Sequence, residues 1–222
     1  MLLQLLFQSP GVGLAWIAVI IVALSVHEFA HAAVAHAKGD PTAEQYGRLT
    51  LNPLAHLDLM GLIPLLLFGF GWAKPVPYNP YHFKHPRWDS LMVALAGPGS
   101  NLALAAVAGI VYRILTATGG NQGLLPAFLL IAALVNLLLF FFNLIPIYPL
   151  DGSKILDTLF VRPYQQIWLM KLKIYGPQVL LVLVLISLFT HVDPFFFISI
   201  PAQLACYGLT GEVCYAAIAG SI

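Results

Sequence analysis

The N-terminal part of the chain carries almost no charge, and this feature most limits the folds that it can adopt. Glu28 is the first charged side chain, and the next is Lys38. Residues 11–37 form an apolar run of about 27 residues, which as an α-helix would be roughly 40 Å long and could cross a bilayer with tilt. No basic segment precedes this run, and it continues into HEFAHAAVAHA, so we do not expect a cleaved signal peptide.

The composition of the whole chain agrees with a membrane protein. Apolar residues make up 60% of the 222 residues and charged residues 9%, whereas soluble domains have about 25% charged residues. The net charge of +1 gives no general attraction for polyanions, so we do not expect a nucleic-acid partner. Cys206 and Cys214, the two cysteines, lack the spacing of a zinc finger or a CxxC motif. We expect an all-α polytopic membrane protein with residues 1–222 in a single domain.

Other apolar stretches predict further membrane-spanning helices. Residues 91–114 and 124–147 are the two strongest candidates. A fourth span is expected over residues 177–192. Residues 194–218 are also apolar, but two prolines interrupt them, and the sequence leaves open whether they cross the membrane or lie at its surface.

Residues 59–73 are apolar but too short for an ordinary spanning helix, and they contain a proline and several glycines. If this segment enters the membrane and returns, the loops 38–58, 74–90 and 148–176 share one face. That face then holds every lysine and arginine of the chain except Arg113, and the positive-inside rule makes it cytoplasmic. We therefore expect a re-entrant, membrane-embedded loop, which could also provide an extended edge of β type for a bound substrate.

The sequence HEFAH at residues 27–31 has the spacing of a metal site. His27 and His31 are four residues apart, so one face of a helix can present both imidazoles to the same ion. Imidazole is a common zinc ligand, and Glu28 lies beside the pair, where it could take a proton from zinc-activated water. These groups lie roughly 16 Å inside the interface marked by Lys38, where ionisable residues are costly unless paired, metal-bound or hydrated. Packed polar residues without a metal are the alternative.

Two histidines do not complete a zinc site, and Asp151 is the best candidate for a third ligand. It lies in NLIPIYPLDG, where two prolines and a glycine stop a long apolar helix. The alternative is that Asp151 caps the following helix. A re-entrant segment at 59–73 would bring Asp151 to the membrane face of the histidines, whereas a crossing segment would separate them by most of the bilayer. The residues judged less suitable as ligands are His36, His56, Asp58, His82 and His85.

The stretch from Gly97 to Gly109 is rich in small residues, which predicts close packing between helices. Asn101 lies within this stretch. We expect it to form a hydrogen bond between helices, and an approach to the metal site remains open as the alternative.

Several motifs together resemble the site-2 protease family of intramembrane zinc metallopeptidases, peptidase family M50. More closely, the chain is similar to the short bacterial and archaeal members that lack a PDZ insertion. The resemblance covers roughly residues 15–160. The motifs that carry it are HEFAH (27–31), the GPGSN turn (97–101), NLIPIYPLDG (143–152), GWAKPVPYN (71–79) and LNPLAHLD (51–58).

The resemblance implies roles for individual residues. One Zn²⁺ per chain would be held by His27, His31 and Asp151, with Glu28 as the general base. Asn143 matches the asparagine that is thought in this family to hold or polarise the scissile peptide. One departure is Tyr148, where many relatives carry proline, and it leaves Asp151 in register.

The resemblance also implies an architecture and a location. We expect a three-helix catalytic core over about residues 11–160, with a re-entrant loop, followed by C-terminal membrane segments over about 177–218. The expected enzyme is a multi-pass protein of a prokaryotic cell membrane that cleaves peptide bonds within or near transmembrane segments. Its active site would be reached from the cytoplasm, and its partners would be a transmembrane protein substrate and the lipid bilayer. The sequence predicts neither the substrate nor the oligomeric state.

The main alternative is a non-proteolytic, metal-binding membrane transporter or scaffold. A transporter is expected to contain internal repeats or intramembrane ligands in both halves. In this chain the ionisable groups gather in one pair of motifs, and no repeat is evident. A proteolytically inactive relative would be expected to lack Glu28 or a ligand. The sequence therefore favours the peptidase.

Overall fold

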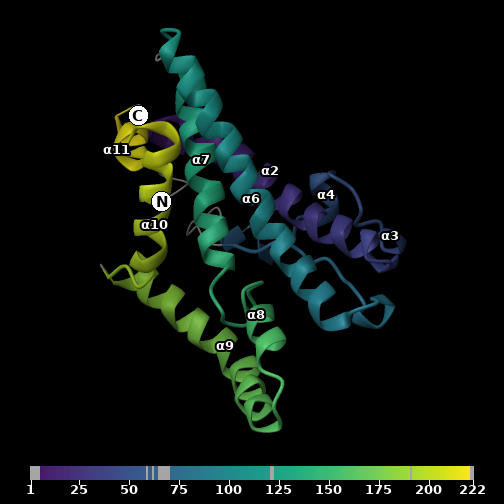
Figure 1. Cartoon of the computed structure of the whole chain (residues 1–222). Coiled ribbons are helices and arrows are strands. Elements are labelled where there is room, and N and C mark those ends of the chain that lie inside the picture. The colour runs from purple at the N-terminus through teal and green to yellow at the C-terminus, as the bar shows by residue number, and fades with distance from the viewer. Residues whose placement is uncertain are drawn as a thin grey trace.

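Figure 1 shows the computed structural model of the chain, which describes residues 6–58, 60–61, 63–64, 71–120, 123–190 and 192–220. Four helices in these residues are long and apolar enough to cross a membrane. They are α2 (Pro10–Ala37), α6 (Pro86–Ala117), α7 (Leu124–Asn143) and α9 (Pro163–Phe189). The prediction of an all-α polytopic membrane protein is confirmed.

Helices α2, α6 and α7 pack against one another as a three-helix core. Small residues allow the close approach, since Ala23 of α2 and Ala105 of α6 are fully buried. Helix α7 contributes the bulk of the interior through Ile131, Leu134 and Leu137, which are also fully buried. Lipid is as apolar as leucine, so this tight packing, and not the exclusion of water, stabilises helix association in a bilayer.

Helix α6 is longer than the predicted span of 91–114 and contains the stretch that was expected to be a turn. It begins at Pro86, in the first helical turn, where the missing N–H of proline costs nothing. Residues 97–101 are helical and Pro98 is buried inside α6, so the expectation of a turn was wrong. Pro98 removes the backbone N–H that would donate to the Ala94 carbonyl, and such a loss is tolerated in membrane helices. Close by, the Ser100 hydroxyl donates to the Gly97 carbonyl at 2.7 Å.

The predicted fourth span, residues 177–192, begins too late in the sequence. Helix α9 begins at Pro163 and not at residue 177, and Pro177 lies inside it. Hydropathy finds only the apolar part of this helix, whereas its start depends on polar capping. The side chain of Gln165 accepts a hydrogen bond from the Arg162 backbone N–H at 3.0 Å, which satisfies one of the donors that a helix N-terminus leaves unpaired.

The C-terminal apolar stretch forms two short helices, α10 (Phe196–Thr210) and α11 (Cys214–Ala219). The expected interruption at Pro201 does not occur, since this proline lies within α10. The chain breaks instead at Gly211, whose φ of 83° is the left-handed conformation that glycine adopts at helix ends. A disulfide between Cys206 and Cys214 joins the two helices, a pairing that the sequence did not predict.

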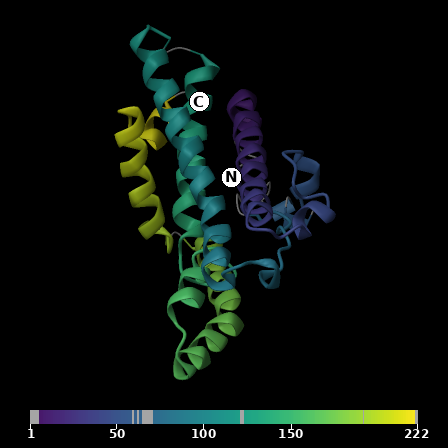
Figure 2. The ribbon, with the colours of Figure 1, turned by 45° about the vertical axis from the view of Figure 1, so that its right-hand side comes forward.

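Helices α9 and α10 run in the same general direction and form a C-terminal arm beside the core. Figure 1 and Figure 2 show α9 rising from the loop after α8 (Ser153–Leu159), with α10 continuing towards the far end of α6. At that far end, the Arg113 side chain donates to the Gly208 carbonyl at 2.9 Å. The arm therefore passes from the end of the molecule with the Asp151 loop to the end with Arg113.

The predicted re-entrant segment 59–73 lies partly outside the described residues, which omit 59, 62 and 65–70. Its two flanks lie side by side. Leu57 and Ala73 form an isolated antiparallel bridge, the one β pairing among the described residues, and the Lys74 N–H donates to the His56 carbonyl at 2.8 Å. The chain thus enters and leaves this segment at the same place.

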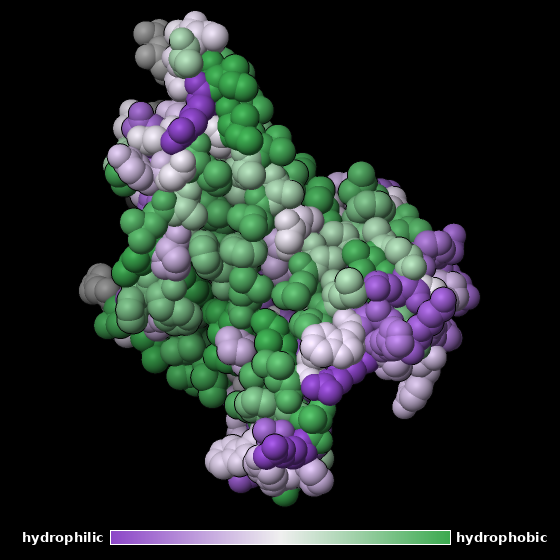
Figure 3. Space-filling view, in the orientation of Figure 1, coloured by the Kyte–Doolittle hydropathy of each residue, from purple (hydrophilic) through white to green (hydrophobic). Residues whose placement is uncertain are grey.

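Short helices mark the polar loops that join the long ones. Figure 3 shows hydrophilic residues gathered over the loops near α3 and at the lower end of the molecule, with a broad apolar surface between them and the tip of α6. The long apolar helices and this distribution describe a multi-pass membrane protein. These short helices include α3 (Thr42–Gln45), α4 (Pro53–His56), the 3₁₀ helix η1 (Pro80–His82) and α8.

Candidate metal centre

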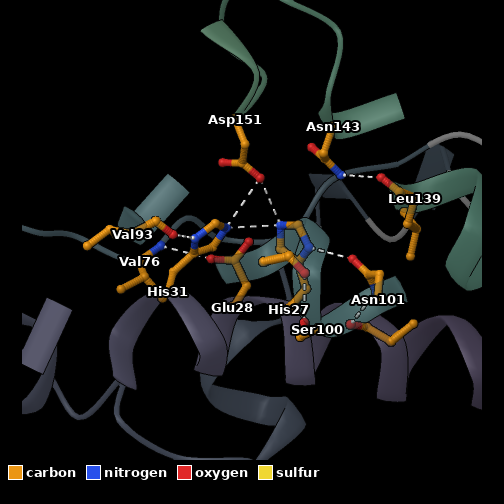
Figure 4. Close-up of polar contacts among 12 residues, drawn as sticks. His27, Glu28, His31, Val76, Val93, Ser100, Asn101, Leu139, Asn143 and Asp151 are labelled. Carbon is orange, nitrogen blue, oxygen red and sulfur yellow. Dashed lines mark hydrogen bonds and ion pairs between the residues drawn. The ribbon is translucent and has the colours of Figure 1, made fainter. Parts of the chain in front are cut away.

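The histidines of α2 and the carboxylate after α7 meet inside the helix bundle, as Figure 4 shows. The Nε2 atoms of His27 and His31 are 3.0 Å apart. Asp151 Oδ2 lies 3.2 Å from His27 Nε2 and 3.3 Å from His31 Nε2. This oxygen is buried and accepts no hydrogen bond within the described residues. Three such ligand atoms so close together fit a single metal ion and suit zinc.

The ring orientation of His31 is set by a backbone carbonyl. Its Nδ1 lies 2.7 Å from the Val93 carbonyl oxygen of α6. A carbonyl only accepts hydrogen bonds, so Nδ1 carries the proton and the lone pair of Nε2 is available to a metal ion held between it and Asp151.

The ring orientation of His27 is set by two asparagines. His27 Nδ1 lies 2.6 Å from Asn101 Oδ1. The Asn101 amide donates to Asn136 Oδ1 at 2.9 Å, and the Asn136 amide donates to the Ala132 carbonyl at 2.8 Å. The Ala132 carbonyl can only accept, so Asn136 must donate to it through its NH₂ group and accept from Asn101 through Oδ1. Asn101 then offers its own Oδ1 to His27, so His27 Nδ1 must be the donor. Asn101 thus bonds between helices, as expected, and also contacts a residue of the candidate metal site.

Gly97 makes room for both histidines. A Cβ atom at this position would lie 2.6 Å from His27 Nε2 and even closer to His31 Nε2. Gly99, two residues later, has open space where its Cβ would be. Sequence reasoning identified the small residues of α6 but missed the role of Gly97, since the pattern alone does not say which glycine faces α2.

Glu28 and Asn143 line the same cavity of about 610 Å³ as the three candidate ligands. Glu28 is buried, and its Oε2 accepts a hydrogen bond from the Val76 backbone N–H at 3.1 Å. Asn143 lies on the last turn of α7, where its amide donates to the Leu139 carbonyl at 3.0 Å. The cavity therefore places a carboxylate and an amide beside the candidate metal site.

Other walls of the cavity come from distant parts of the chain. The extended segment 71–78 forms one wall, and α9 forms another through Pro177, Leu180 and Val184. The lining is mostly apolar apart from the residues already described and Lys154.

A polar cluster holds the loop that carries Asp151. The carboxylate of Asp157 accepts a hydrogen bond from the Tyr148 hydroxyl and lies 3.3 Å from the Lys154 ammonium and 3.2 Å from that of Lys173. Burial alone would raise the pKa of Asp157, but the Tyr148 hydroxyl and the two lysines outweigh it and hold the pKa below its ordinary value. These contacts hold the loop that carries Asp151 to α8 and α9.

The alternative metal ligands lie elsewhere and have other partners. Exposed His36 pairs with Glu44 at 3.4 Å, whereas His82 Nδ1 lies 2.6 Å from Asp40. His56 Nε2 donates to the Thr50 carbonyl at 2.7 Å. Asp58 accepts a hydrogen bond from the Trp72 indole and His85 immediately precedes α6. Within the described residues, His27, His31 and Asp151 form the one cluster suited to a metal.

The fold and the site define a multi-pass membrane protein with a buried group of two histidines and one carboxylate, as in metallopeptidases. A family model described as "Peptidase family M50" matches residues 113–187. The protein named "Putative zinc metalloprotease YwhC" of Bacillus subtilis is 44% identical over 179 residues, which cover 78% of this chain and 81% of that protein. The chain belongs to peptidase family M50 and is a zinc metallopeptidase.

A further relative is more distant. The protein named "Putative zinc metalloprotease Rip2" of Mycolicibacterium smegmatis is 34% identical over 184 residues, which cover 79% of this chain and 68% of that protein. No solved structure matches the chain.

Proposed function

We propose that this protein is an intramembrane endopeptidase that hydrolyses peptide bonds within or near transmembrane segments of other membrane proteins. The observation that carries this proposal is the position of Glu28 beside the His27, His31 and Asp151 cluster, in a cavity enclosed by apolar helices. A peptide bond must reach this cavity to be cut, and transmembrane segments are the chains that are present at this depth.

The three clustered residues would hold one Zn²⁺, which supplies a Lewis acid and lowers the pKa of a bound water to about 7. Glu28 takes the proton of the attacking water and returns it to the leaving nitrogen. The Val76 N–H orients the Glu28 carboxylate for this transfer. Asn143, on the α7 side of the cavity, positions the scissile peptide.

The segment after the re-entrant loop could hold the substrate in an extended form. Ala73 is paired with Leu57, but the hydrogen bond across this pair is donated by the N–H of the neighbouring Lys74. The main-chain groups of Ala73 are therefore directed away from Leu57, and Ala73 lines the cavity. An extended substrate strand can pair with such an edge.

Two independent features support an active site that is reached from the cytoplasmic side of the membrane. All basic residues except Arg113 lie within residues 38–58, 74–90 and 148–176, in the loops or in the helical turns next to them. The Cys206–Cys214 disulfide belongs to the opposite end, where Gly208 accepts a hydrogen bond from Arg113. Disulfides persist in oxidising compartments, so this end fits the outer side of the membrane.

The function is tested by incubating the purified protein with a model single-span peptide in detergent. The wild type should cleave the peptide, and a zinc chelator, Glu28→Gln and Asp151→Asn should each abolish cleavage. Undiminished cleavage in both variants, or in the presence of the chelator, would refute the mechanism, whereas no cleavage by the wild type would favour a metal-binding transporter or scaffold.

A further inference from the structure

A second cavity, of about 330 Å³, adjoins the catalytic one. It lies between α2, α7, the joint of α9 and α10, and α11. The two cavities share four lining residues, Leu24, Gly71, Leu139 and Phe142. A chain bound at the candidate metal site could therefore extend into the second cavity without leaving the protein surface.

The second cavity contains a carboxylate in an apolar setting. Asp193 is the one Asp, Glu, Lys or Arg between Lys173 and Glu212. Most other lining residues are apolar, and the polar ones include Ser199 and Tyr215. Asp193 lies in the connection between α9 and α10 and its side chain is exposed, so it is open to a bound partner.

Asp193 also has a local structural role, but this role does not use all the hydrogen-bond acceptor sites of its carboxylate. Its carboxylate accepts hydrogen bonds from the Phe195 N–H at 2.9 Å and the Ser199 hydroxyl at 3.0 Å, which caps the start of α10. A carboxylate has about four acceptor sites. Capping alone could be done by a neutral asparagine, and it does not account for the adjoining cavity.

Asp193 lies two residues before Phe195, which places it near the end of α7 that carries Asn143. The ring of Phe195 packs against that of Phe142, with centroids 5.9 Å apart, and Phe142 immediately precedes Asn143. On α2, the shared residue Leu24 is one helical turn before Glu28.

The separation of the two cavities can be estimated along helix α2. Trp16, Ile20 and Leu24 line the second cavity and repeat every four residues along the face that leads to Glu28. At 1.5 Å per residue, Leu24 and Ile20 lie about 6 and 12 Å from Glu28 along the helix. An extended substrate advances about 3.3 Å per residue, so this separation corresponds to roughly two to four substrate residues.

We propose that the second cavity is a substrate subsite in which Asp193 binds a hydrogen-bond-donating side chain, an ammonium or an amide, of the transmembrane substrate. This side chain lies about two to four residues from the scissile bond, on the side towards Arg113. The charge of the carboxylate selects a donor, and an ammonium gains most because it also pairs with the charge. The subsite rests on the proposed peptidase function and adds substrate selection to it.

The test uses single-span peptides in which one lysine or one leucine is placed at successive positions around the cut. For the wild type, lysine at one position two to four residues from the cut should raise kcat/KM about tenfold over leucine. Asp193→Asn retains a capping side chain and should remove this preference, so that the ratio of kcat/KM for the lysine and leucine peptides falls to about one. Glu212→Gln, which removes the next acid along the chain, is the matched control and should keep the preference.

Binding to the Glu28→Gln protein separates a failure of the subsite from a failure of the proposed function, because it requires no cleavage. A photoreactive amino acid at Tyr215 should cross-link the lysine peptide more than the leucine peptide, and Asp193→Asn should equalise them. That result supports the subsite even if the wild type cleaves nothing. Equal cross-linking of both peptides with Asp193 present, or a cleavage preference that Asp193→Asn leaves unchanged, would overturn the subsite.

Discussion

The three-helix core and the C-terminal arm differ in the burial and hydrogen bonding of their polar side chains. In the core, Asn101 and Asn136 are buried and engaged in a chain of hydrogen bonds that starts at His27 and ends at the Ala132 carbonyl. In the arm, α9 makes few contacts with other helices, and Asp193 lies exposed at its joint with α10. The core is therefore suited to hold a fixed metal geometry, and the arm to form a wall against which different substrates can lie.

This comparison predicts that substitutions in the core alter metal binding first, whereas substitutions in the arm alter stability or substrate choice and leave metal binding intact. Figure 2 shows α10 on the opposite side of α6 and α7 from α2, and α10 packs against both of these core helices.

The largest effect is expected for Gly97→Ala. The added methyl group would collide with His27 and His31 and should lower zinc affinity roughly 100-fold. Gly99→Ala adds the same methyl group to the same helix in open space and should leave zinc affinity unchanged. Both affinities can be measured by titration against a competing chelator. Equal affinities in the two variants would show that the close approach of α6 does not shape the site.

A smaller loss is expected for Asn101→Leu, which removes the hydrogen-bond acceptor of His27. Zinc affinity should fall roughly 10- to 100-fold, as is usual when a partner of a ligand is lost. Asn136→Leu leaves Asn101 Oδ1 beside His27 and should cost less. The same chelator competition measures both, and a greater loss for Asn136→Leu would contradict the proposed direction of the chain.

In the arm, the double variant Cys206→Ser/Cys214→Ser should lower the free energy of unfolding by about 2 kcal/mol. Zinc affinity and peptide cleavage should remain at wild-type values, because the disulfide lies at the end of the molecule away from the site. Denaturant titration of the wild type with and without reductant provides the control. A parallel loss of zinc would show that the arm and the core are coupled.

The smallest effect concerns Asp40, in the loop after α2. Burial alone would raise the pKa of Asp40, but hydrogen bonds from His82, Thr42 and Asn79 hold it below its ordinary value. A carboxyl whose pKa is lower in the folded state stabilises the fold above an unfolded pKa of about 3.9, and this contribution is lost as the pH falls through the folded value. Melting temperatures measured from neutral to acid pH should fall less steeply for Asp40→Asn than for the wild type. Parallel curves would contradict this contribution.

The sequence predicted the parts that depend on local geometry or on simple membrane topology. The spacing of His27 and His31 places them on one helical face in any helix, and the re-entrant topology required Asp151 to lie near them. The structure brings these three residues together. Their roles as ligands, with Glu28 and Asn143 as catalytic groups, remain predictions for the experiments above.

The features that the sequence did not predict depend on which surfaces of distant helices meet. Nothing in the order of residues shows that Gly97 faces the histidines or that Asn136 of α7 completes the contacts of Asn101. Packing also overrode local signals, since Pro98 and Pro201 lie within helices. The start of α9 was missed because polar capping, and not hydropathy, sets it.

The most direct test of the central claim compares the wild type and Glu28→Gln in liposomes that contain a single-span substrate. Zinc content and the masses of the cleavage products are measured on the same samples. Both proteins should hold one zinc ion per chain, and only the wild type should produce fragments cut within or near the spanning segment. Wild-type cleavage by Glu28→Gln, or fragments cut far from the span, would contradict an intramembrane peptidase that uses Glu28 as its base.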